Sequence, residues 1–168
     1  MNQHIEKHND VTVMDIYEYI NLIAAFDTQS GYDNSGILVG DLGGQVTSAM
    51  LALDVTGDVI RQAQESGCEL IISHHPIMFT PIQRLPSDSL EYKLANAGIA
   101  LISAHTNLDI AKGGVNYHLA SQLGLANLEP VDDGGFGIMA WLPHPMKPQE
   151  LAEMVRDRLA CDSVGYVE

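Results

Sequence analysis

Three short apolar runs, separated by segments with helical periodicity, constrain the fold of this chain more than any other feature. Residues 48–55, 69–73 and 99–104 are predicted strands, because each is an almost unbroken run of apolar side chains. Residues 58–66 and 88–97 between them are predicted helices, each followed by a glycine that suits a helix C-terminus. Strands that alternate with helices form parallel sheets that are buried on both faces. The predicted fold class is therefore α/β, with a mostly parallel sheet flanked by helices on both faces.

The remaining segments extend this pattern without dividing the chain. Helices are predicted over 12–27, 115–123 and 148–160, and shorter strands over 37–39, 137–142 and 163–168. Thr12 and Asp15 have the spacing of a capping box, and Pro148 suits the first turn of a helix. A length of 168 residues without a low-complexity linker favours a single domain over 1–168, with residues 1–11 as a flexible N-terminus.

The charge of the chain argues against two classes of partner. It carries 22 acidic and 8 basic residues, which give a formal net charge of −14. Eight basic side chains spread over the chain are too few to pair with a row of phosphates or with an anionic lipid surface. We therefore expect no binding to nucleic acid or membrane. The sequence has no apolar stretch of about 20 residues, no signal-peptide core and no CxxC pair. These features predict a cytoplasmic protein, and its acidity suits a bound cation.

Histidines follow two of the predicted strands at the point where each strand ends. His74 and His75 come directly after the strand 69–73, and His105 comes directly after the strand 99–104. Asp109 follows four residues after His105. Because right-handed crossovers bring the carboxyl ends of parallel strands to one edge of the sheet, we expect these four side chains to converge there.

Imidazole and carboxylate groups in such a cluster suit Zn²⁺, Mn²⁺, iron or Ni²⁺. Two ions about 3.5–4 Å apart could clamp a substrate and activate a bridging water, and such a pair commonly shares a carboxylate. Asp109 is one candidate for that role, and Asp54, at the end of the strand 48–55, is a weaker one. A histidine at a strand end can instead serve only as a hydrogen-bonding residue. His118, on a predicted helix, is interpreted in that structural way, and His144, between two prolines, as loop surface.

Five strings of residues, in their order and spacing, resemble one known family. They are DNSGILVG at 33–40, ALDVT at 52–56, IISHHPIMF at 71–79, HTNLD at 105–109 and GGVN at 113–116. The chain resembles the GTP cyclohydrolase 1 type 2 family, also called the NGG-interacting-factor-three-like family, from about residue 13 to its end. The resemblance implies an α/β fold, a two-metal site and ring-like homo-oligomers. It also implies metal ligands at His74, His75 and Asp109, with His105 at or next to the site.

The chain departs from the family pattern at several points. Family members continue into a second α/β half, whose His and Glu complete the metal site, and this sequence ends at Glu168. Ile138 and Tyr117 stand where the family commonly has Arg and Asp. Three functions stay open: a metal-dependent hydrolase of a nucleotide or another small molecule, a non-catalytic metal-binding or assembly subunit, and a truncated gene product. With four candidate ligands, we expect weaker metal binding than in a full-length relative, and little hydrolysis.

Overall fold

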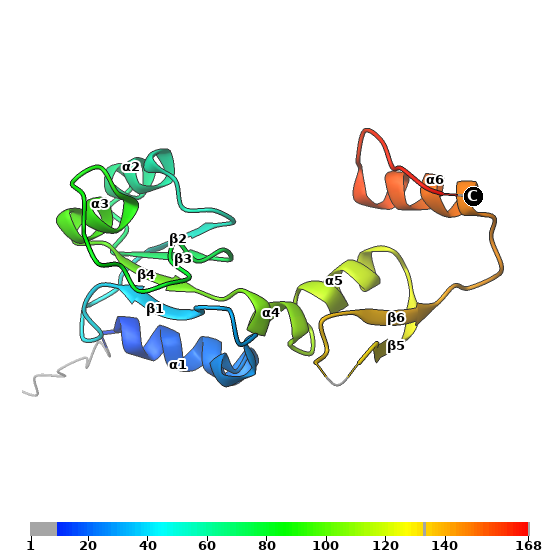
Figure 1. Ribbon diagram of the computed structural model, residues 1–168, viewed down its shortest axis with the longest axis horizontal. Coiled ribbons are helices and arrows are strands. Elements are labelled where there is room, and N and C mark those ends of the chain that lie inside the picture. The colour runs from blue at the N-terminus through cyan, green and yellow to red at the C-terminus, as the bar shows by residue number, and fades with distance from the viewer. Residues whose placement is uncertain (1–9, 133, 168) are drawn as a thin grey trace, which may run out of the picture. The chain divides into compact units, whose positions relative to one another are not determined.

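The computed structural model describes residues 10–132 and 134–167, and the described chain divides after Asn107 into two compact units (Figure 1). The first unit contains a sheet of four strands, β1 (Gly36–Val39), β2 (Ala49–Ala52), β3 (Leu70–Ser73) and β4 (Ala100–Ser103), in the order β1-β4-β3-β2. β2, β3 and β4 are parallel, and β1 is antiparallel to β4. The predicted α/β class with a mostly parallel sheet is therefore confirmed.

Helices cover both faces of this sheet. α2 (Gly57–Glu65) and α3 (Leu90–Ala97) lie on one face, and α1 (Val13–Ile23) lies on the other (Figure 1). α1 begins with the predicted capping box between Thr12 and Asp15, and a short 3-10 helix, Phe26–Thr28, follows it. α3 ends at Gly98 with φ +68°, a left-handed conformation that glycine adopts without strain. On the α2–α3 face the buried core consists of Val55, Ile60, Ala63, Ile71, Leu94, Ile99 and Leu101.

The three parallel strands end in register at one edge of the sheet. Ala52 is paired with Ser73, and Ser73 is paired with Ser103. The backbone ladder continues beyond the strands, because the N–H of His74 donates to the carbonyl of Ala52 at 3.1 Å. The N–H of Ala104 likewise donates to the carbonyl of Ser73 at 2.9 Å. The residues that follow β3 and β4 are thus held side by side, as the predicted topology requires.

The second unit is smaller and begins within α4 (Thr106–Ile110), which spans the boundary between the units. It continues with α5 (Val115–Gln122), the antiparallel strands β5 (Ala126–Pro130) and β6 (Ile138–Trp141), and α6 (Pro148–Leu159). β5 and α4 are elements that the sequence patterns do not predict. The chain divides into two compact units, and the single domain over 1–168 stays a prediction.

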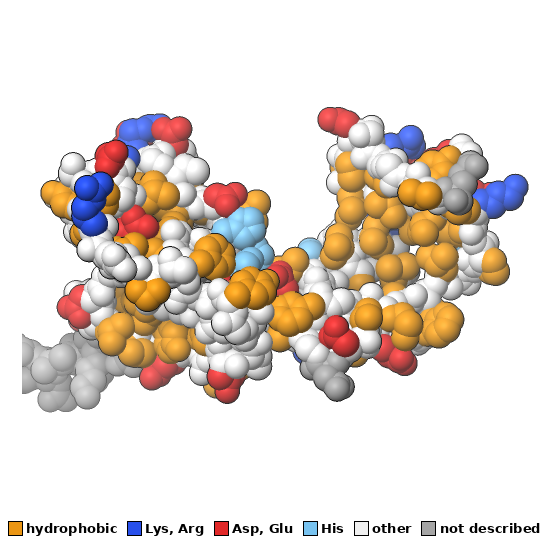
Figure 2. Space-filling view, viewed as in Figure 1, with side chains coloured by type: hydrophobic (Ala, Val, Ile, Leu, Met, Phe, Trp, Pro, Cys, Tyr) orange, Lys and Arg blue, Asp and Glu red, His pale blue; other side chains and the backbone are white. Residues whose placement is uncertain are grey.

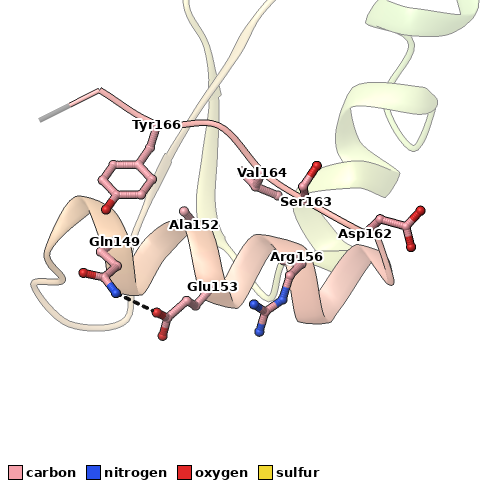
Figure 3. A pocket seen from close by; sticks show the side chains of 8 residues that line it. All are labelled: Gln149, Ala152, Glu153, Arg156, Asp162, Ser163, Val164 and Tyr166. Carbon is pink, nitrogen blue, oxygen red and sulfur yellow. Dashed lines mark hydrogen bonds between the residues drawn. The ribbon is translucent and has the colours of Figure 1, made fainter.

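The strand predicted over 163–168 is wrong for the residues that the structure describes. Residues 163–167 form no strand. They run back along α6, with Val164 and Tyr166 beside Ala152 and Gln149 (Figure 3). A segment with alternating apolar residues becomes a strand only where a neighbouring strand accepts its backbone hydrogen bonds, and this segment packs on a helix instead.

The flexible N-terminus predicted over 1–11 falls on residues 1–9, outside the described residues, and on Asp10 and Val11. No described helix has the length and apolar character that crossing a membrane requires.

Candidate metal centre

Three histidines gather at the carboxyl edge of the parallel strands. His74 and His75 follow β3 directly, and His105 follows β4 after one intervening residue. One ring nitrogen of each lies within 4.8 Å of the others, and the ring centroids are 5.0–5.4 Å apart. Figure 2 shows histidine side chains gathered on the surface of the first unit. The convergence predicted for these three residues is therefore observed, and the cluster is close enough to hold a divalent metal ion.

Each imidazole in the cluster is held through its Nδ1 atom. His74 Nδ1 donates to the carbonyl oxygen of Ala104 at 2.9 Å. His75 Nδ1 lies 2.7 Å from Oδ1 of Asp54, and His105 Nδ1 lies 3.1 Å from Oδ1 of Asp33. Carbonyl and carboxylate oxygens only accept hydrogen bonds, so in the neutral rings Nδ1 carries the proton and Nε2 carries the lone pair. This is the arrangement that orients histidines as metal ligands.

Asp33 is the most elaborately held group beside the cluster. Its side chain is 0% exposed and contacts its own loop, residues 33–35, as well as the residues that follow β4. Its Oδ1 accepts from the Asn34 N–H at 2.7 Å as well as from His105. Its Oδ2 accepts from the Ser35 hydroxyl at 3.1 Å and from both the N–H and the hydroxyl of Thr106.

These contacts decide the charge of Asp33. Burial acts to raise the pKa of its carboxyl, but the hydrogen bonds from Thr106, His105 and Asn34 outweigh burial and lower the pKa to about 2. The carboxylate is therefore ionised at neutral pH. An ionised carboxylate can only accept a hydrogen bond from His105, so the proton between them belongs to His105 Nδ1.

The two other predicted carboxylates have different positions. Asp54, the weaker candidate for a bridging ligand, is 60% exposed, and its Oδ1 is the partner of His75 Nδ1. Asp109 lies on α4 in the second unit, four residues after His105, and its place among the metal ligands stays a prediction.

Sequence reasoning missed the role of Asp33 and one aromatic neighbour of the cluster. In the sequence, Asp33-Asn34-Ser35 stands out only as part of the string 33–40 that carries the family resemblance, because nothing local indicates that the Asp33 side chain points inward. The ring of Phe79 packs edge-on near His105, with centroids 6.1 Å apart, and about half of the side chain is exposed. The Nδ2 of Asn34 donates to the carbonyl of Met78 at 2.9 Å and so ties down the chain beside Phe79. Phe79 gives the cluster one apolar wall.

The histidines of the second unit are exposed, and their interpretation as non-ligands stays a prediction. His118 lies on α5, with its Nε2 at 3.4 Å from Nε2 of Gln122. His144 lies in the exposed segment between β6 and α6.

Comparison of the sequence with known proteins gives one consistent result. The family described as Duf34/NIF3 (NGG1p interacting factor 3) matches residues 11–168. A GTP cyclohydrolase 1 type 2 homolog of Clostridium perfringens is 36% identical over an alignment of 162 residues, and the match covers 90% of this chain and 62% of that protein. A homolog with the same name from Clostridium acetobutylicum is 34% identical over 165 residues, again with 62% of its length covered. This chain thus spans 62% of the length of these curated relatives.

Solved structures agree with the sequence matches. The crystal structure of Staphylococcus aureus hypothetical protein SA1388 superposes with a TM-score of 0.81 and 26% identity, over 90% of this chain and 65% of that chain. Reduced HcgD from Methanocaldococcus jannaschii superposes with a TM-score of 0.77 and 33% identity, over 88% of this chain and 60% of that chain.

Proposed function

Because the chain belongs to the Duf34/NIF3 (NGG1p interacting factor 3) family, we propose that it binds divalent metal ions through His74, His75 and His105, together with Asp109. One observation carries the proposal: three imidazoles, with one ring nitrogen of each within 4.8 Å of the others, are each held by an acceptor at Nδ1. With Nδ1 protonated, Nε2 is the nitrogen of each ring that would bind a metal, and three imidazoles suit Zn²⁺, Mn²⁺, iron or Ni²⁺.

We propose further that the chemistry of the centre is the hydrolysis of a small molecule, such as a nucleotide, with little turnover by this chain, since four candidate ligands are few for two metal ions. A divalent ion bound there would polarise a carbonyl or phosphoryl oxygen, or make a water acidic. The protein's own contribution is to orient the three imidazoles through Asp33, Asp54 and the Ala104 carbonyl, and to shield one side with Phe79. The names of the Clostridium relatives support this class of reaction. The family resemblance also supports assembly into homo-oligomers, and a cytoplasmic location stays a prediction.

A non-catalytic metal-binding or assembly subunit is the second candidate, and the charges beside the cluster favour it. Asp33 and Asp54 both use a carboxylate oxygen to hold an imidazole Nδ1. The three gathered ligands are therefore neutral in the form that binds metal, and a pair of adjacent cations needs a shared negative ligand to offset their repulsion. This arrangement supports one well-held ion more than two.

Metal titration and an activity assay on the same preparation separate the two candidates. We expect calorimetry of the full chain with Zn²⁺ to show saturable binding, and the same with Mn²⁺ at lower affinity, since imidazole prefers Zn²⁺. The metal-loaded protein is then assayed against a panel of nucleotides and phosphate or acyl esters. Binding with turnover supports the hydrolase, and binding without turnover supports the non-catalytic subunit. No binding of either metal would contradict both.

A further inference from the structure

Asp33 connects two parts of the first unit that are far apart in the sequence. Its carboxylate divides its contacts, with Oδ1 facing the His105 imidazole and Oδ2 facing the N–H and hydroxyl of Thr106. His105 and Thr106 lie 72 and 73 residues further along the chain. Ser35 completes the connection, because its hydroxyl donates to Asp33 and accepts from the N–H of His105, each at 3.1 Å. The ring and the backbone of His105 are therefore both fixed by the segment 33–35.

A buried carboxylate with this many donors is more than a turn residue. The local N–H of Asn34 and the Ser35 hydroxyl would suffice for a turn at 33–35, and such turns are common on protein surfaces. The side chain of Asp33 is instead fully buried against His105, at a position where an acceptor decides which ring nitrogen carries the proton.

We propose that Asp33 is a positioning residue of the metal centre: it holds His105 as the Nδ1–H tautomer and so presents Nε2 to the ion. This proposal rests on the proposed function, because it concerns the residue that orients one of the proposed metal ligands. Among the described residues, Asp33 is the acceptor that His105 Nδ1 contacts, so without this carboxylate both neutral tautomers become populated. Outer-shell partners of this kind commonly change metal affinity by about 10–100-fold.

Nitrogen-15 NMR of the histidine rings tests the tautomer without any metal. In the metal-free wild-type protein at about pH 9, where peptide imidazoles are neutral, we expect His105 to show the Nδ1–H pattern alone. In Asp33→Ala the same ring should show a mixture of both tautomers. Asp58→Ala is the matched control, because this carboxylate is 81% exposed on α2 and should leave the His105 signals unchanged. A wild-type His105 in the Nε2–H form would overturn the proposal, whether or not the variant folds.

Zinc titration of the same proteins tests the consequence for the site. We expect Asp33→Ala to bind Zn²⁺ about 10–100-fold more weakly than the wild type, and Asp58→Ala to bind it equally well. Thr106→Val separates positioning from stability, because it removes one hydroxyl partner of Asp33 but leaves Oδ1 facing His105. It should lower the thermal midpoint and keep both the tautomer and the Zn²⁺ affinity.

The two proposals fail in different ways. Unchanged zinc affinity and an unchanged tautomer in Asp33→Ala would overturn the positioning role. The positioning role would also be overturned if Thr106→Val lost as much Zn²⁺ affinity as Asp33→Ala, since Asp33 would then act only on stability. A wild-type protein that binds no Zn²⁺ would refute the proposed metal centre itself, and the spectra of the metal-free protein would still decide whether Asp33 sets the His105 tautomer.

Discussion

Substitution of His75 by alanine should reduce Zn²⁺ affinity by about 100-fold or more, because even outer-shell changes commonly cost 10–100-fold and this change removes a ligand. The substitution leaves two imidazoles in the cluster and removes the ring that Asp54 Oδ1 contacts. The fold should tolerate it, because the His75 side chain is 43% exposed and stands beyond the end of β3. Calorimetry with Zn²⁺, together with elemental analysis after dialysis, measures the effect.

His144→Ala is the matched control for this experiment. His144 is also exposed, but it lies between β6 and α6 in the second unit. We expect its replacement to leave the bound metal unchanged, and circular dichroism should show both variants folded. If the two variants and the wild type retain equal amounts of metal, His75 is not a ligand and the proposed centre is wrong.

Leu101→Ala should destabilise the first unit by about 2–5 kcal/mol, the usual range for emptying a buried leucine site. Leu101 lies on the central strand β4, is 0% exposed, and belongs to the buried core between the sheet and the helices α2 and α3. Central strands cannot move to fill the space, because each is hydrogen-bonded to neighbours on both sides. Hydrogen exchange of the β3 and β4 amides is the appropriate measurement, since Trp141 lies in the second unit and its fluorescence would report on that unit.

Leu51→Ala makes the same chemical change on the same sheet. Leu51 lies on the edge strand β2 and is 77% exposed, so its truncation removes little buried surface and should change the stability by less than about 0.5 kcal/mol. Equal effects of the two substitutions would contradict the assignment of β4 to the core.

The central part of the fold could be predicted from local patterns because its strands are buried. The runs 69–73 and 99–104 are apolar on both faces, a pattern typical of inner parallel strands, and both are inner strands in the structure. β5 gave no such signal, since four of the five residues of Ala126–Pro130 are exposed. The tail 163–167 gave a misleading signal, because Val164 and Tyr166 lie beside α6 and not beside another strand. Strand pairing depends on a partner that the local sequence does not specify.

The candidate site could be predicted only as far as topology determines it. The strand ends bring His74, His75 and His105 together, and this follows from the parallel order alone. The acceptors that hold their Nδ1 atoms could not be predicted in the same way. Asp33 comes from a loop before β1, and its inward orientation depends on the donors of His105 and Thr106. Such a contact becomes visible only when the two segments are placed in three dimensions.

The distances along the chain between the paired groups also set the order of events during folding. The imidazoles and their acceptors are separated by 21, 30 and 72 residues. Closing loops of this size costs more chain entropy than one hydrogen bond can offset. We therefore expect the sheet to form before the three rings are oriented. The centre is then a product of the native topology, unlike a zinc finger, in which the ion drives the chain to fold. Refolding of the first unit should accordingly proceed at the same rate in a chelator as in zinc, with the ion entering a completed scaffold.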